Sequence, residues 1–149
     1  MTASRLQRST QRDSFLDRCN LSHCDPIPLG ADASFRRYYR LAGQGPALLL
    51  MDAPPEYEDV DAFGRVARHL LRLGFRAPQI HHLDRELGFI VLEDFGDQTF
   101  TRLIDSGCDE ATLYTRAIDL LIRIHDHPDA INIELPGYDR TRLIDEALS

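Results

Sequence analysis

Apolar residues follow two different spacings along the chain, and the change falls near residue 96. Before that point, short apolar runs bounded by turn residues predict strands. These runs lie at residues 25–30, 35–41, 47–51, 79–83 and 88–93. Polar or Gly- and Pro-containing turns join the first three runs, and a charged triplet joins the last two. We therefore expect three antiparallel strands followed, further along the chain, by a hairpin.

One long helix is expected between the third and fourth strands. Pro54 and Pro55 end the third strand, because proline has no amide hydrogen to donate to a ladder. Apolar residues then recur at helical spacing from Glu56 to Leu73. Gly74 follows at the position where a residue in the left-handed conformation commonly closes a helix.

Helical spacing also marks both ends of the chain. Residues 5–19 predict a short peripheral helix, and residues 99–106 predict another that Gly107 stops. A longer helix follows Asp109 as its N-cap, with one apolar face made of Leu113, Ala117, Leu120, Leu121 and Ile124. Residues 138–148 predict a last helix with an apolar stripe and no closing residue. This stripe either requires a partner or belongs to a docked helix that frays at its end.

Composition places the chain among globular proteins and narrows its functions. The 149 residues are 43% hydrophobic and 28% charged, which suits one domain. The formal net charge of −7 argues against a nucleic-acid partner, because proteins that bind phosphate backbones gather Lys and Arg on one face. The sequence shows no apolar run of membrane-spanning length and no secretory signal, so we expect a cytoplasmic protein without a membrane partner. Cys19, Cys24 and Cys108 are interpreted as ordinary thiols.

The segment from Gly30 to Arg37 is the first candidate for chemistry. Its small residues, placed between two expected strands, would let backbone amides approach a phosphate closely. Ser34 adds a hydroxyl donor, and Arg36 or Arg37 would supply a bidentate cation. A plain hairpin turn with exposed arginines explains the same residues, because the segment matches neither of the common glycine-rich phosphate loops.

Three runs of sequence carry a resemblance to a known family. GADASFRRYYRL at 30–41, LLLMDAPPE at 48–56 and GFIVLEDFGDQTF at 88–100 resemble runs of bacterial kinases in the aminoglycoside-phosphotransferase family. Within that family they are most similar to the cell-wall-recycling kinases that phosphorylate the anomeric hydroxyl of N-acetylmuramate and N-acetylglucosamine. The similarity extends from about Leu29 to the end of the chain.

The resemblance implies an α+β fold, namely a protein-kinase-like N-terminal lobe with a five-stranded antiparallel sheet and one crossing helix. It divides the chain into a helical extension at 1–25, the N-lobe at 26–93, a hinge at 94–97 and an incomplete helical C-lobe at 98–149. The crossing helix would be residues 56–73.

The resemblance also implies a nucleotide site between the first loop and the hinge. The loop at 29–34 would cover the phosphates of ATP, and adenine would bond to the backbone of Glu93 and Phe95. The expected phosphate-binding residues are Gly30, Ser34, Arg36 and Arg37. The expected apolar walls of the adenine slot are Leu29, Leu49 and Leu92.

One departure from the kinase pattern concerns a cation. Kinase-like folds usually place a lysine on the third strand, where it pairs with the phosphates and with a glutamate of the crossing helix. Here Met51 occupies the corresponding position and no lysine lies near it. We expect Arg37, or as second choice Arg36, to replace this lysine, with Glu56 or Glu58 as the acidic partner of that arginine.

A second departure is that the catalytic loop and the magnesium ligands of the family do not appear in this sequence. The segment 124–132 contains His-x-Asp and an asparagine, but Asn132 follows Asp129 by three positions and Asp126 by six, and neither spacing is the kinase one of five. As a metal site, the group His125, Asp126 and His127 competes with a plain solvated helix end, which we favour. No catalytic or metal residue is therefore assigned.

The resemblance implies that the full-length enzyme transfers the γ-phosphoryl group of ATP, with Mg²⁺, to an N-acetyl amino sugar. Three interpretations of the chain stay open. It is a truncated and inactive kinase, or a small nucleotide-binding module, or an interaction protein that keeps the lobe as a scaffold. The third interpretation includes pairing with a separately encoded second lobe.

Overall fold

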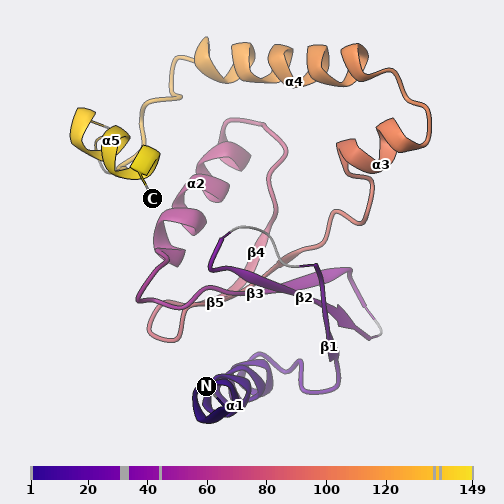
Figure 1. The fold of residues 1–149 in the computed structure, drawn as a ribbon, viewed down its shortest axis with the longest axis vertical. Coiled ribbons are helices and arrows are strands. Elements are labelled where there is room, and N and C mark those ends of the chain that lie inside the picture. Colours follow the sequence, from indigo (N-terminus) through magenta and orange to yellow (C-terminus); the bar gives the residue numbers. More distant parts are fainter. Residues whose placement is uncertain (1, 31–33, 44, 136, 138, 149) are drawn as a thin grey trace.

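The structure is a computed structural model that describes residues 2–30, 34–43, 45–135, 137 and 139–148. It is an α+β fold, as expected. The elements in chain order are α1 (Thr2–Arg18), β1 (Asp25–Pro28), β2 (Arg37–Ala42), β3 (Leu48–Asp52), α2 (Val60–Arg72), β4 (Ile80–Asp84), β5 (Phe89–Glu93), α3 (Phe100–Asp105), α4 (Glu110–His125) and α5 (Arg140–Leu148). Figure 1 shows the sheet in the lower half of the molecule and the later helices above it.

The five strands form one antiparallel sheet in the order β1-β2-β3-β5-β4, which confirms the predicted strands and hairpin. The register fixes which residues share a face, because side chains alternate along each strand. Arg40 pairs with Leu49, and Leu49 pairs with Leu92. Three positions along the same pair of strands, Arg37 pairs with Asp52. These two rows lie on opposite faces of the sheet.

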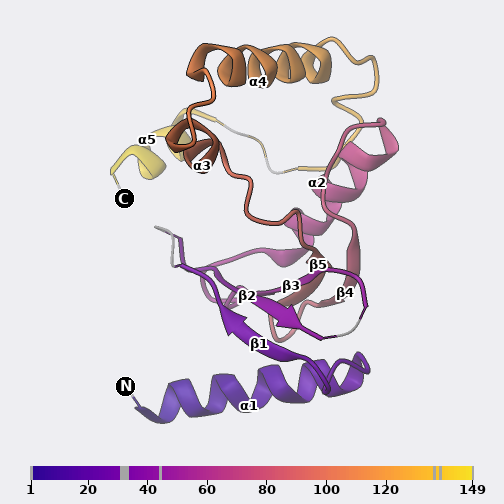
Figure 2. The ribbon, with the colours of Figure 1, turned by 90° about the vertical axis from the view of Figure 1, so that its right-hand side faces the viewer.

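Helix α1 covers the face that carries the Arg37–Asp52 row, called here the α1 face. Phe15 and Leu16 of the helix join a buried cluster with Leu41, Leu48, Leu50, Phe89 and Val91 of the sheet. The Phe15 and Phe89 rings stack with centroids 5.4 Å apart. Figure 2 shows α1 lying along this face, on the side of the sheet away from all other helices. The expected peripheral helix at 5–19 is therefore part of the core.

Helix α2 packs on the opposite face, called here the α2 face. Val60 at its start joins Met51, Ala53, Ile90 and Leu92 in a second buried cluster. The helix begins at Val60, four residues later than predicted, because Asp59 is its N-cap and accepts a hydrogen bond from the Ala62 amide at 3.0 Å. It ends as predicted, with Gly74 at a φ of 80°.

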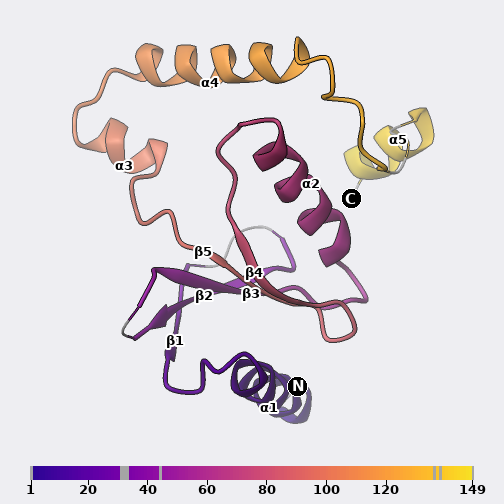
Figure 3. The same ribbon diagram turned by 180° about the vertical axis from the view of Figure 1, so that it is seen from behind.

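Helices α3, α4 and α5 lie on the same side of the sheet as α2 (Figures 1 and 3). Asp109 caps α4 as predicted, since its carboxylate accepts the Thr112 amide at 2.8 Å. The apolar face of α4 is only partly covered: Leu113 is buried and Ile124 half-buried, whereas Leu121 is 57% exposed. The last helix begins at Arg140, two residues later than predicted. No helix in the described part of the chain combines the length and the apolar character needed to cross a membrane.

Candidate functional site

The α2 face of the sheet carries an apolar surface to which β1, β3 and β5 contribute. Leu49 and Leu92 are cross-strand partners, and Leu92 is 4% exposed. Leu29, just after β1, donates its amide hydrogen to the Tyr38 carbonyl at 2.9 Å, so this residue extends the ladder beside β2. Leu29 and Leu49 are half-buried. The structure thus places the three expected wall residues on one side of the sheet, with Leu49 and Leu92 in neighbouring strands and Leu29 across β2 from Leu49.

Met51, the residue that the resemblance places at the position of the kinase lysine, is a core residue. It is 1% exposed and packs in the cluster that includes Val60 and Phe63 of α2. The sequence contains no lysine, so all 17 basic side chains are arginines. Any cation on this face must therefore come from an arginine outside β3.

Arg36 supplies a cation at the edge of the α2 face. Its Nε and Nη2 atoms each lie 2.8 Å from Oε2 of Glu58, and its guanidinium lies 5.8 Å from the centre of the Phe63 ring. Partial burial works against the charge of Arg36, but its hydrogen bond to Glu58 and the charge of Glu58 prevail, so its pKa is raised. Of the two acidic partners considered, Glu58 is the one that pairs with Arg36, and it lies in the turn before α2 rather than on the helix.

Arg37 lies on the other side of the sheet. It is the register partner of Asp52 on the α1 face, and it is exposed. Asp52 itself is held by Arg8 of α1, whose Nη2 atom lies 2.6 Å from its Oδ1. Our first nominee for the missing cation therefore faces away from Met51, while the second nominee, Arg36, reaches a carboxylate on the α2 face.

Gly30 and Ser34 flank a loop whose middle, residues 31–33, lies outside the described residues. No described atom is within 4 Å of the position that a Cβ on Gly30 would take. The Ser34 hydroxyl accepts a hydrogen bond from the Arg36 amide at 3.2 Å. The path of this loop over a phosphate stays a prediction.

The segment after β5 contains the two residues expected at the adenine edge. Glu93 closes the strand and pairs through its side chain with Arg76 at 2.6 Å. The Phe95 side chain is 52% exposed, and the Arg76 guanidinium lies 4.7 Å from its ring centre. The Asp94 amide still bonds to the Ala47 carbonyl of the sheet at 2.9 Å. The backbone turns away from the sheet after this bond, where Gly96 has a φ of 78°.

An ion cluster at this turn was missed by sequence reasoning. Arg40 of β2 places Nε 2.5 Å from Oδ2 of Asp94 and Nη2 2.9 Å from Oδ1 of Asp97. The hydrogen bond from Arg40 lowers the pKa of Asp97. Arg40 stands two positions after Tyr38 on β2, so both side chains lie on the face that packs against the α2 cluster. A charged residue on this otherwise apolar face was the signal available in the sequence. The carboxylates that pair with Arg40 lie more than 50 positions away in the sequence, and no local sequence pattern marks them as its partners.

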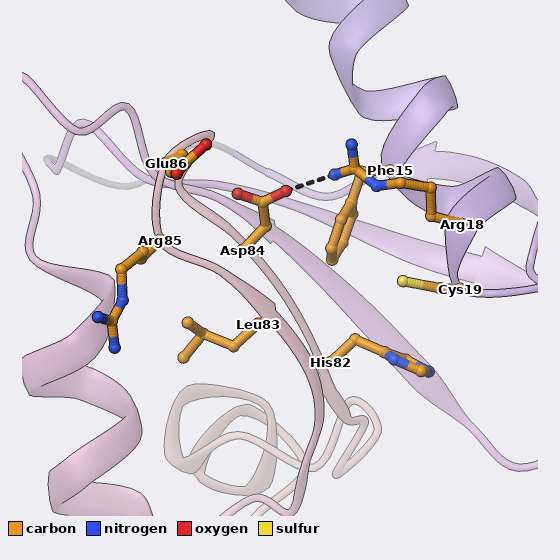
Figure 4. A pocket seen from close by; sticks show the side chains of 8 residues that line it. All are labelled: Phe15, Arg18, Cys19, His82, Leu83, Asp84, Arg85 and Glu86. Carbon is orange, nitrogen blue, oxygen red and sulfur yellow. Dashed lines mark hydrogen bonds and ion pairs between the residues drawn. The ribbon is translucent and has the colours of Figure 1, made fainter.

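Two hollows are found on the α1 side of the sheet. One, of about 400 Å³, is lined by the end of α1 and by β4, and Figure 4 shows the Arg18–Asp84 ion pair at its rim with Cys19 and His82 below. Burial raises the pKa of the Cys19 thiol, which favours its uncharged form. The other, of about 1060 Å³, lies between α1 and the Pro54–Tyr57 segment and includes Arg37. Neither is lined by Gly30, Ser34, Arg36, Glu93 or Phe95.

The described residues bring together no group of three or more His, Cys, Asp or Glu side chains that could hold a metal ion. The segment considered as a metal site begins at the end of α4: His125 is the last helical residue and Asp126 the C-cap. The His127 ring packs edge-on against Phe75, with centroids 6.0 Å apart. Asn132 donates its side-chain amide to the Asp129 carboxylate at 2.8 Å. These contacts are structural.

Comparison with known proteins gives the family. The model of the phosphotransferase enzyme family, APH, matches residues 25–147. The chain belongs to this family. That assignment confirms the resemblance carried by the three sequence runs, and the sheet with its crossing α2 is the fold that the resemblance implied.

Three curated relatives of this APH chain have the same name, N-acetylmuramate/N-acetylglucosamine kinase. The one from Pseudomonas aeruginosa is 42% identical over 118 residues, which cover 78% of this chain and 34% of the relative. The one from Pseudomonas putida is 38% identical over 109 residues, covering 73% and 31%. The one from Caulobacter vibrioides is 34% identical over 149 residues, covering 82% and 41%. The chain thus spans roughly one third to two fifths of the length of these relatives.

Proposed function

We propose that this chain is the ATP-binding part of a cytoplasmic kinase that phosphorylates the anomeric hydroxyl of an N-acetyl amino sugar. The observation that carries the proposal is the Arg36–Glu58 pair, which stands on the same face as the apolar wall of Leu49 and Leu92. A cation paired with a carboxylate beside an apolar slot is the arrangement that a kinase lobe requires for a nucleotide. The family supplies the reaction class.

The nucleotide would lie along this face with its base toward the hinge. Adenine would rest on the apolar wall and bond to the backbone of Glu93 and Phe95. Gly30 and Ser34 would approach the phosphates, and Arg36 would take the place of the usual lysine. Arg37, on the α1 face, is the weaker candidate for a direct phosphate contact.

The division of the chain follows from this arrangement. Residues 26–93 would form the N-lobe behind a helical extension at 1–25, residues 94–97 the hinge, and residues 98–149 the beginning of a helical lobe. The exposed apolar side chains of α4, such as Ile118 and Leu121, support a further covering lobe. The catalytic aspartate and the Mg²⁺ ligands would come from that lobe, because the described residues offer no metal-ligand cluster. The lobe would be part of the same protein or separately encoded.

The proposed acceptor rests on the names of the curated relatives. N-acetylmuramate and N-acetylglucosamine are therefore the first acceptors to test, in the whole protein. Aminoglycosides are the matched alternative, because kinase-like folds in this family act on several classes of hydroxyl.

Three experiments test the proposal. Isothermal titration of this chain with ATP should give saturable binding that ADP competes, and a flat titration would remove the nucleotide role. The whole protein should transfer phosphate from radiolabelled ATP to N-acetylglucosamine, and transfer to kanamycin alone would refute the acceptor. The intact mass of the protein from its natural source decides whether the 149 residues are the whole protein.

The uncovered α4 favours a second candidate, a non-catalytic interaction module. Its exposed apolar residues include Tyr114, Ile118, Leu121 and Ile122. A module of this kind would bind a partner through α4 whether or not ATP is present. Substituting Ile118 and Leu121 with Ser would then abolish partner binding and leave ATP binding unchanged.

A further inference from the structure

Arg40 joins three parts of the chain at the end of the apolar wall. Its side chain leaves β2 in the row of Leu49 and Leu92, on the α2 face. Its guanidinium contacts two carboxylates that follow β5: Nε lies 2.5 Å from Asp94, while Nη1 and Nη2 lie 3.0 and 2.9 Å from the two oxygens of Asp97. The fork thus binds Asp97 with both terminal nitrogens, the geometry that gives arginine its orientational specificity.

Asp94 shapes the turn on which Phe95 stands. Its side chain is 5% exposed, and its Oδ1 atom accepts the Gly96 amide at 2.7 Å. Its own amide is tied to the Ala47 carbonyl at 2.9 Å. A carboxylate so nearly buried requires a cation, and Arg40 provides it. Before Phe95 the backbone is therefore held by the bond to Ala47, and after it the Gly96 amide is held by the Asp94 side chain that Arg40 fixes.

The cluster continues into the first helix after the turn. Arg102 of α3 places Nη1 3.6 Å from Oδ2 of Asp97. Arginines from β2 and from α3 thus meet on the same carboxylate, so the cluster bridges the sheet and the helices at the hinge segment.

We infer that Arg40 is a positioning residue for the base end of the nucleotide: through Asp94 it holds the Phe95 amide where the edge of adenine would bond. This inference rests on the proposed function and assigns Arg40 no contact with the base or the phosphates. Arg36 would then lie at the phosphate end of the proposed nucleotide site, and Arg40 would lie at its hinge end.

Binding of adenosine, ADP and ATP to this chain separates the two arginines. Arg40→Gln should weaken all three ligands by the same factor, about tenfold, because the three share only the base and the ribose. Arg36→Gln should weaken ADP and ATP but leave adenosine unchanged. Arg85→Gln is the matched control, since Arg85 pairs with Asp61 on the surface away from the hinge. Arg40→Lys should recover only part of the loss, because an ammonium cannot bind both carboxylates as a fork.

Hydrogen exchange distinguishes positioning from a general loss of stability. In Arg40→Gln the amides of residues 95–97 should exchange faster, while the amides of β3 and β5 keep their wild-type protection. Faster exchange throughout the sheet would overturn the inference. Unchanged adenosine affinity in Arg40→Gln, or an effect confined to ADP and ATP, would overturn it as well. If the wild-type chain binds no adenosine or nucleotide, the proposed function fails and the inference with it, a result distinct from normal binding by Arg40→Gln.

Discussion

The two faces of the sheet use the same chemical pair, an arginine with a carboxylate, for different purposes. On the α1 face, Arg8 bonds to the buried Asp52 and lies 4.0 Å from the centre of the Phe89 ring, where it joins α1 to the sheet beside the larger hollow. On the α2 face, Arg36 and Arg40 hold their carboxylates at the edges of an apolar wall. What each pair joins decides its role: the Arg8–Asp52 pair ties a helix to the sheet and stabilises the fold, whereas the Arg36 and Arg40 pairs lie at the two ends of the apolar wall, where we propose that they position a ligand.

The largest effect should come from the core of the α1 face. Phe89 is fully buried and stacks on Phe15 of α1. Phe89→Ala should lower the free energy of unfolding by about 4 kcal/mol, because it removes a large ring and leaves a cavity. Urea unfolding followed by circular dichroism measures this change. A loss below about 1 kcal/mol would mean that α1 does not pack on the sheet in solution.

The next largest effect should come from the ion pair on that face. Arg8→Met keeps most of the packing on Phe89 but leaves the Asp52 carboxylate buried without its partner, which should cost about 3 kcal/mol. Arg12→Met is the control, because Arg12 pairs with the exposed Asp13, and it should cost below about 1 kcal/mol. Adding Asp52→Asn to Arg8→Met should recover part of the loss. Equal costs for Arg8→Met and Arg12→Met would contradict a structural role for Asp52.

Two adjacent arginines test the contrast between the faces directly. Arg36→Gln should weaken ATP binding about tenfold through loss of a charged contact on the α2 face. Arg37→Gln, one residue along but on the α1 face, should leave ATP binding within about twofold of wild type. Isothermal titration measures both. The reverse ranking would restore Arg37 as the substitute for the missing lysine.

The sequence was sufficient to predict the strands, the helices and most of their ends. Turn residues and periodicity report local conformation, so Gly74 and Asp109 were recognised as a helix stop and a helix start. The start of α2 was placed too early because the acidic run after Pro55 suits a helix, while the actual N-cap, Asp59, lies at its end. Local patterns do not show which of several acidic residues takes the cap.

The site was less predictable, because it depends on which side chains lie on each face of the sheet and on which helix covers that face. Alternation along β2 puts Arg37 and Tyr39 on one face and Tyr38 and Arg40 on the other, but it does not reveal that α1 covers the former. The choice between Arg36 and Arg37 as the substitute for the lysine required knowing that α1 packs on the face that carries Arg37. The Arg40 cluster required more, since its carboxylates come from a segment that only the β3–β5 pairing brings alongside.

The smallest effect concerns the acid titration of Asp97 on the α2 face. Its hydrogen bond with Arg40 lowers its pKa below the ordinary value of 3.8, so the pair contributes stability above that value and loses it as pH falls through the lower, folded value. The carboxyl resonance of Asp97, followed by NMR from pH 6 to pH 2, should therefore have its midpoint below 3.8 in the wild type. In Arg40→Gln the midpoint should rise toward that ordinary value, because the lost cation no longer favours the charged carboxylate. A midpoint that does not move would mean that Arg40 and Asp97 are apart in solution, and the rim of the α2 face would then lack the bridge from β2 to the hinge.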